Sequence, residues 1–220
     1  MIPAHVINLE RATDRRLRME AEWRPVFGPG LTFFPAVDRR SIENGEVADL
    51  SCRPYGQSVR RRLTYGETAC LASHLSLLRQ CLATTDAPFA IVMEDDVVPI
   101  GAPRCIASEI TRISSSNITP DVLLMFRPSN RYGMSGGDDP IGILAPPFPW
   151  GTCMVAYSRH GMHKYIEAFS DFPSPADHWH ILAAICRISI LRNPIAKHIG
   201  TDTYVGNEHR GPGSQRNYLP

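Results

Sequence analysis

The hydrophobic pattern of the first forty residues alternates between strand and helix. Residues 4–9 form a short apolar run, which predicts a buried strand. Residues 13–23 carry apolar side chains at helical spacing, with Thr13 or Asp14 as the candidate N-cap, and a Gly-Pro-Gly sequence ends this helix. Residues 31–37 are rich in β-branched and aromatic side chains and predict a second strand. A strand–helix–strand start is typical of an α/β protein with a parallel sheet.

The middle of the chain continues this alternation after an irregular stretch at 38–63. The segment from Thr64 to Glu67 has the form of a capping box, and it precedes a helical pattern over 67–82. Residues 89–93 are all apolar and predict a strand that runs directly into three consecutive carboxylates. The later pattern predicts helices over 103–113, 160–169 and 177–187, and strands over 122–126, 152–157 and 188–191.

Two segments lack any period. Residues 127–149 are rich in glycine and proline, and a loop of this length inside a compact domain is usually functional or disordered. Residues 207–220 are polar, which predicts a flexible tail. Because no internal repeat or linker interrupts the rest, we predict one domain over 1–206, with a single Rossmann-like, mostly parallel sheet flanked by helices.

Composition narrows the class of protein without naming a partner. The 220 residues are 43% hydrophobic and 20% charged, and the formal net charge is +1, so we expect no nucleic-acid partner. The six cysteines show no C-x-x-C and no zinc-like spacing. The chain starts without the features of a signal peptide and contains no run of about 18 apolar residues, so we expect a cytoplasmic protein without a membrane span, with peripheral membrane association left open.

Arginines gather in two clusters along the sequence. These clusters are either solvated faces or arms that bind an anionic ligand: Arg11, Arg15, Arg16 and Arg18, and Arg60, Arg61 and Arg62.

The three carboxylates Glu94, Asp95 and Asp96 are the strongest chemical signal. They follow a buried strand, whose carboxyl end is where sheets of this class bind ligands. In an extended chain Glu94 and Asp96 share one side and Asp95 faces the other. A divalent cation would relieve their mutual repulsion, and oxygen ligands suit Mn²⁺ or Mg²⁺. Such an ion could stabilise a departing nucleoside diphosphate. The alternative is a solvated strand end with one carboxylate capping the next turn.

Further short motifs occur in a fixed order over roughly residues 4–180. They are Val6-Ile7-Asn8-Leu9 with Arg11, Asp14, Arg15 and Arg16, Phe34-Pro35-Ala36-Val37-Asp38, Leu63-Thr64-Tyr65-Gly66-Glu67, Ser73-His74, Ile91-Val92-Met93-Glu94-Asp95-Asp96-Val97, Gly151-Thr152, Ser158-Arg159-His160-Gly161 and Pro175-Ala176-Asp177-His178-Trp179. The ordered set resembles glycosyltransferase family 25, the lipopolysaccharide-type enzymes related to collagen galactosyltransferases.

The resemblance implies a GT-A-like fold, a UDP-sugar donor (most typically UDP-galactose), Mn²⁺ or Mg²⁺ at a DxD-type motif, and transfer with inversion. The donor-binding residues that it implies are Asn8, Leu9, Arg11, Arg15, Glu67, Ser73, His74, Glu94 and Asp95. The predicted metal ligands are Glu94 and Asp96, with His198, from the C-terminal part of the chain, as a further ligand. Without the resemblance, His74 would be interpreted as a histidine of the core and His198 as a surface histidine.

Asp177 is the candidate catalytic base. The resemblance places it before a helix, in the stretch where inverting transfer needs a group that takes the proton from the acceptor hydroxyl. The alternative is that Asp177 is only the N-cap of that helix.

Other functions and acceptors stay open from the sequence. A non-catalytic nucleotide-sugar-binding domain and another metal-dependent α/β enzyme, such as a nucleotidyltransferase, are the competing hypotheses. The acceptor could be a glycan, a lipid-linked sugar or a peptide. The pattern does not decide between galactose and glucose, because that choice depends on one or two hydroxyl contacts.

Overall fold

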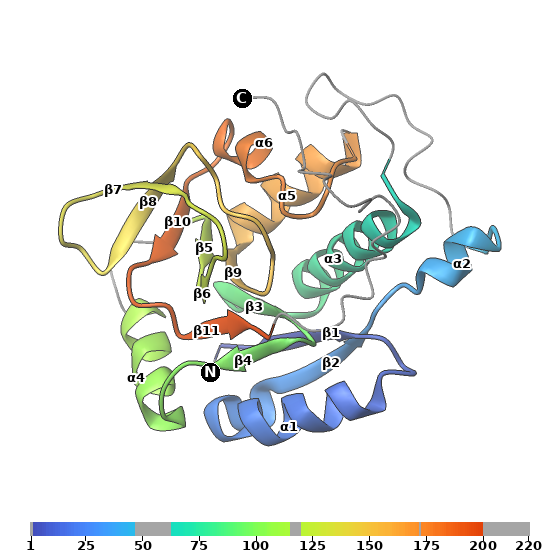
Figure 1. Cartoon of the computed structure of the whole chain (residues 1–220), viewed down its shortest axis with the longest axis horizontal. Coiled ribbons are helices and arrows are strands. Elements are labelled where there is room, and N and C mark those ends of the chain that lie inside the picture. Colours follow the sequence, from blue (N-terminus) through green and yellow to red (C-terminus); the bar gives the residue numbers. More distant parts are fainter. Residues whose placement is uncertain (1, 47–62, 115–119, 172, 200–220) are drawn as a thin grey trace.

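A large sheet with helices on both sides forms the centre of the chain. The computed structural model describes residues 2–46, 63–114, 120–171 and 173–199. The helix α3 packs against α5 on one side of the sheet, and α1 packs against α4 on the other (Figure 1). The helices are α1 (Thr13–Phe27), α2 (Arg39–Glu43), α3 (Tyr65–Thr84), α4 (Pro103–Ser114), α5 (Arg159–Asp171) and α6 (Trp179–Ala183). The predicted α/β class is confirmed.

The main sheet has eight strands of mixed direction. In spatial order they are β2 (Leu31–Pro35), β1 (Ala4–Asn8), β3 (Phe89–Glu94), β9 (Met154–Ser158), β5 (Val122–Leu124), β10 (Ile188–Leu191), β8 (Ile141–Ala145) and β7 (Gly133–Ser135). The neighbours β2, β1 and β3 pair in parallel, as do β5 and β10. The strands β9, β8 and β7 pair antiparallel with their neighbours, so the parallel part is concentrated where the chain begins.

A second, three-stranded sheet was not expected from the sequence. It joins β4 (Val97–Pro99), β11 (Ala196–His198) and β6 (Phe126–Arg127). The predicted strand over 122–126 is therefore two strands, β5 and β6, which belong to different sheets. The small sheet brings residues near the C-terminal end of the described chain beside the segment that follows β3 (Figure 1).

The start of α1 differs from the sequence-based expectation. The N-cap position is Ala12, with no capping hydrogen bond from its side chain, so the assignment of Thr13 or Asp14 as N-cap is wrong. A backbone turn sets the entry of the helix instead, because the amide of Ala12 donates to the carbonyl of Leu9 at 2.8 Å. Asp14 lies in the first turn, where its charge complements the positive end of the helix. The helix then runs to Phe27, and the Gly-Pro-Gly sequence forms the short 3-10 helix η1 (Gly28–Gly30).

The stretch predicted to be irregular contains the short helix α2. Asp38 begins it, and its carboxylate accepts a hydrogen bond from the amide of Arg40 at 3.1 Å. Residues 47–62, which include the second arginine cluster, lie outside the described residues. The capping box that begins α3 is confirmed: Thr64 accepts from the amide of Glu67 at 3.1 Å, and Glu67 accepts from the amide of Thr64 at 3.0 Å.

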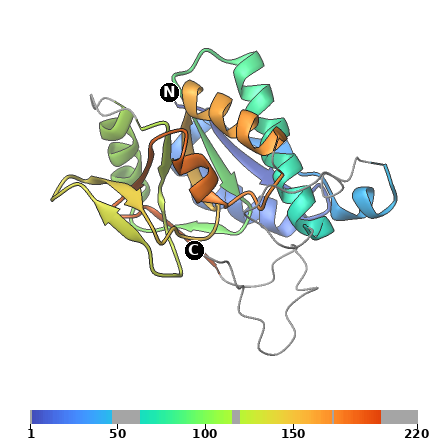
Figure 2. The same cartoon turned by 90° about the horizontal axis from the view of Figure 1, so that it is seen from above.

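The glycine-rich segment at 127–149 is more ordered than its composition predicts. It contains the hairpin of β7 and β8, which extends the main sheet beyond β10 (Figure 2). Gly136 and Gly137, between the two strands, have φ values of 107° and 55° that favour glycine. The expectation of one long loop over 127–149 is therefore wrong, whereas a functional role of this segment stays a prediction.

The last predicted elements are present with different lengths. The strand β10 matches its prediction, but α6 covers only Trp179–Ala183 of the helix expected over 177–187. The tail over 207–220 lies outside the described residues. Among the described helices, none combines the length and the apolar character needed to span a membrane.

Candidate functional site

The carboxyl ends of β1 and β3 open into a cleft whose opposite wall is α3. Its lining brings together side chains from five separate parts of the chain. The residues selected from the sequence that line it are Leu9, Arg11, Arg15, Ser73, His74, Glu94, Asp95, Asp96 and His198. Asn8, Glu67 and Asp177 are not among the residues that line this cleft.

All three consecutive carboxylates reach the cleft. Glu94 is the last residue of β3, and Asp95 and Asp96 form a turn before β4. The expectation that Asp95 faces away from its neighbours is wrong, because the chain leaves the extended conformation directly after Glu94. The turn thus concentrates negative charge at one end of the central strand.

Asp95 is held by the protein itself. Its carboxylate accepts hydrogen bonds from the Nδ2 atom of Asn8 at 2.8 Å and from the Nη1 atom of Arg15 at 2.7 Å, and its backbone carbonyl accepts from Arg18 at 2.7 Å. Burial raises the pKa of Asp95 and is opposed by the hydrogen bonds from Arg15 and Asn8. Asn8, at the end of β1, and Arg15, in α1, therefore hold the acidic turn in place.

Asp96 is held on one side only. Its Oδ2 atom lies 3.0 Å from Nε2 of His198, and its Oδ1 atom is buried without a hydrogen bond to any residue that the structure describes. The hydrogen bond with Asp96 raises the pKa of His198, against the opposing effect of burial. A carboxylate oxygen without a partner, next to an imidazole and a second acid, fits a hard divalent cation such as Mn²⁺ or Mg²⁺. His198 belongs to β11, whose pairing with β4 in the small sheet places it beside Asp96. In addition, the amide of Ile199 donates a hydrogen bond to the carbonyl of Asp96 at 3.0 Å.

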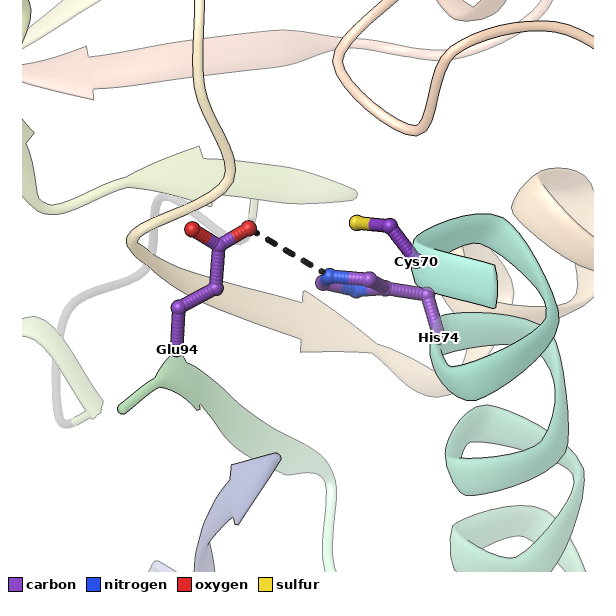
Figure 3. A group of neighbouring side chains, drawn as sticks. All are labelled: Cys70, His74 and Glu94. Carbon is purple, nitrogen blue, oxygen red and sulfur yellow. Dashed lines mark ion pairs between the residues drawn. The ribbon is translucent and has the colours of Figure 1, made fainter. Parts of the chain in front are cut away.

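Glu94 faces a different set of neighbours. One carboxylate oxygen accepts a hydrogen bond from the hydroxyl of Thr152 and lies 3.7 Å from Nε2 of His74. Cys70 and His74 project from α3 towards Glu94 (Figure 3). Burial and the carboxylates of Glu94 and Asp177 raise the pKa of the Cys70 thiol well above its usual value. Sequence reasoning gave Thr152 and Cys70 no role in the site, although both lie in or beside the motifs that carried the family resemblance.

Other residues around the cleft hold its surrounding segments in place. Arg11 pairs with Asp38 at 2.8 Å and lowers the pKa of that carboxyl. The hydroxyl of Ser73 accepts from the amide of Val37 at 2.8 Å and donates to a carbonyl of its own helix. Glu67 is buried and caps α3. These contacts fix the segment after β2 against α3, so the cleft has a fixed wall opposite the acidic turn.

Asp177 is connected to the acidic turn through the segment before β9. Its carboxylate accepts a hydrogen bond from the amide of Gly151 at 2.9 Å, and the next residue, Thr152, donates to Glu94. The N-cap of α6 is His178, so the interpretation of Asp177 as only a helix cap is wrong. Gly151 has a φ of 97°, a conformation that favours glycine, and this lets its amide point at Asp177.

The first 99 residues of the chain resemble a known family of enzymes. Residues 1–99 match the model described as glycosyltransferase family 25 (LPS biosynthesis protein). This match makes the first part of the chain similar to glycosyltransferase family 25. The family segment carries β1, α1, α3, β3 and the acidic turn, whereas His198, Thr152 and Asp177 come from the part that follows it.

The chain is also similar to two curated relatives in sequence and to one solved structure in fold. A glycosyltransferase 25 family member of Anopheles gambiae is 31% identical over 97 residues, which cover 42% of this chain and 16% of that protein. The lacto-N-neotetraose biosynthesis glycosyltransferase LgtB of Neisseria meningitidis is 29% identical over 187 residues, which cover 79% of this chain and 63% of LgtB. The chain thus spans less than two thirds of either relative. The crystal structure of a glycosyltransferase involved in the glycosylation of the major capsid of PBCV-1 has a TM-score of 0.51 at 8% identity, over 92% of this chain and 94% of that one, which shows a shared fold.

Proposed function

We propose that this chain is a metal-dependent, inverting glycosyltransferase that moves galactose from UDP-galactose to a hydroxyl group of a glycan. The observation that carries the proposal is the surroundings of Asp96, where one carboxylate oxygen is buried without a partner while the other lies 3.0 Å from His198. The family 25 sequence of residues 1–99 supports the reaction class. The activity of the neisserial relative in lacto-N-neotetraose biosynthesis supports a glycan as acceptor.

The cation in this proposal is Mn²⁺ or Mg²⁺, held by Asp96 and His198 with Glu94 nearby. When bound, it supplies positive charge that stabilises the departing diphosphate. Arg15 supports this arrangement from the other side, because its guanidinium lies 2.7 Å from Asp95 and 3.7 Å from Asp96. Arg15 thereby neutralises Asp95, and Asp96 keeps one carboxylate oxygen for the ion.

The donor in this proposal binds along the wall formed by the turn after β1 and by α3. Leu9 and Val37 offer apolar surface on this wall. Arg11 and Arg15 also line it, and their guanidinium groups carry N–H donors that suit a phosphate-containing ligand even while each is paired with a carboxylate. The contacts of Ser73 and Asp38 keep this wall in place before a ligand arrives, which reduces the ordering cost of binding.

Asp177 takes the proton of the acceptor hydroxyl in this proposal. A carboxylate suits this role when it is fixed in position, and the amide of Gly151 at 2.9 Å provides that constraint. The link from Gly151 through Thr152 to Glu94 connects the proposed base to the donor side of the site.

The experiment compares UDP binding and UDP release, with and without Mn²⁺, for three isosteric variants. We expect Asp96→Asn to lose metal-assisted UDP binding and turnover, because an amide lacks the negative charge that a carboxylate offers to a divalent ion. We expect Asp177→Asn to bind UDP normally and to lose turnover by about 100-fold or more, the typical contribution of a general base. Asp86→Asn is the matched control, because Asp86 is exposed and lies away from the cleft.

Two results would reject the proposal. Full activity of Asp96→Asn would remove the metal assignment. UDP binding by the unchanged protein without any turnover, across nucleotide-sugar donors and glycan acceptors, would instead favour the non-catalytic nucleotide-sugar-binding domain.

A further inference from the structure

Cys70, His74 and Glu94 form a cluster in which the proposed transfer reaction involves only Glu94. One donor atom from each residue lies within 4.8 Å of the other two. Cys70 and His74 are four residues apart in α3, so their side chains leave the same face of the helix, and Glu94 meets them from the end of β3 (Figure 3). The three side chains thus converge from two rigid elements.

His74 is the unusual member of the cluster. Its side chain is only 1% exposed, yet neither ring nitrogen forms a hydrogen bond with a residue that the structure describes. Buried polar atoms are almost always paired, so a histidine of this kind needs a partner that is not a protein hydrogen bond. The nearest acidic oxygen, on Glu94, is 3.7 Å from Nε2, which is too long for a hydrogen bond.

The same separation suits two ligands of one metal ion. Atoms about 2.0–2.3 Å from a tetrahedral ion lie about 3.3–3.8 Å from each other. We infer that Cys70, His74 and Glu94 form a second cation site, selective for Zn²⁺ over Mg²⁺ and Mn²⁺. This inference does not depend on the proposed transfer activity.

Ligand chemistry sets the selectivity. A thiol and an imidazole are soft or intermediate donors, which favour zinc, whereas Mg²⁺ and Mn²⁺ prefer oxygen. Three protein ligands leave a fourth position for water, and all three residues line the cleft, so an ion can enter from it. The site differs from the one at Asp96 in ligand type but shares Glu94 with the set expected there.

The test measures Zn²⁺ binding to the whole chain by competition with a chromophoric chelator, without nucleotide or acceptor. We expect Cys70→Ser to weaken binding by about 100-fold or more, because losing a ligand should exceed the roughly 10- to 100-fold cost of losing an outer partner. The matched control is Cys105→Ser, because Cys105 is an exposed cysteine in α4. This control and Asp96→Asn should keep the affinity of the unchanged protein, and excess Mg²⁺ should not displace the ion.

A spectroscopic probe makes the result independent of affinity. Co²⁺ bound to the unchanged protein should show a thiolate charge-transfer band that Cys70→Ser lacks and Cys105→Ser retains. Equal Zn²⁺ affinity in the unchanged protein and Cys70→Ser, or loss of binding in Asp96→Asn, would overturn the inference. Failure of UDP binding in the earlier experiment leaves this outcome unaffected, so the two proposals can fail separately.

Discussion

Neighbouring carboxylates in the acidic turn have opposite surroundings, and this difference organises the site at the scale of single residues. Asp95 is paired with Arg15 and Asn8, whereas Asp96 keeps a buried oxygen without a partner among the described residues. Pairing one acid lowers the repulsion that three adjacent charges would create. The turn can therefore form without a cation and still offer ligands to one.

His178 is a buried histidine whose charge would be costly. It is 1% exposed, its Nδ1 atom lies 2.8 Å from the hydroxyl of Ser174, and its ring meets that of His180 at a centroid distance of 3.6 Å. Burial, together with the nearby His180, lowers the pKa of His178 from 6.5 to about 3. The folded protein therefore holds this ring neutral at a pH where the unfolded chain would protonate it.

This shift predicts a loss of stability in mild acid. Between pH 6.5 and about 3 the unfolded state binds more protons at His178, so its contribution is complete above pH 6.5 and declines as the pH falls. At about 1.4 kcal/mol per pH unit, the contribution lost by pH 5 is about 2 kcal/mol. Urea unfolding of the unchanged protein and of His178→Gln at pH 7, 6 and 5 checks this. The free energy of unfolding should fall more steeply for the unchanged protein, and parallel curves would contradict the assignment.

At the scale of elements, long periodic segments were predictable and short strands were not. The apolar run of β3 and the capping box of α3 carry strong local signals, and both were identified. The strands β4, β6 and β11 have two or three residues each, so no period can be read from them. Their pairing depends on the tertiary contacts of the second sheet. This is also why Asp96 and His198 could be named as ligands from a resemblance, while the strand that joins them could not.

The packing of α5 against the start of β5 gives a prediction about an element. A Cβ atom on Gly161 would lie 1.9 Å from the carbonyl oxygen of Asp121, which already accepts a hydrogen bond from the amide of Ser158 at 2.9 Å. Alanine raises helix propensity by about 1 kcal/mol, but the clash costs about 1–3 kcal/mol or more. We therefore expect Gly161→Ala to unfold at lower urea concentration than the unchanged protein.

The matched control for this prediction is His163→Ala in the same helix. His163 is exposed, so alanine there gains helix propensity without a clash. If Gly161→Ala were as stable as His163→Ala, α5 would be free to move away from β5, and the close approach would not constrain the fold.

For the whole molecule, the site is assembled from both ends of the described chain. The segment that matches the family 25 model, residues 1–99, supplies the acidic turn and the wall that we propose binds the donor, and β11 adds His198 from 102 residues beyond Asp96. The hydrogen bond from the amide of Ile199 to the carbonyl of Asp96 at 3.0 Å links the two regions through the backbone as well. A ligand bound at Asp96 should therefore slow motion in both.

Hydrogen exchange measured by mass spectrometry tests this coupling. With UDP and Mn²⁺, we expect slower amide exchange in the peptide that contains the acidic turn and in the peptide that contains β11, because binding stabilises only the state in which both are in place. Asp96→Asn should remove the protection from both peptides. His198→Asn should remove it from β11 while leaving part of it at the turn, where Asp96 and Glu94 remain. In the unchanged protein, protection confined to the turn would mean that residues 1–99 alone hold the cation. The contact between His198 and Asp96 would then serve only to join the second sheet to the end of β3.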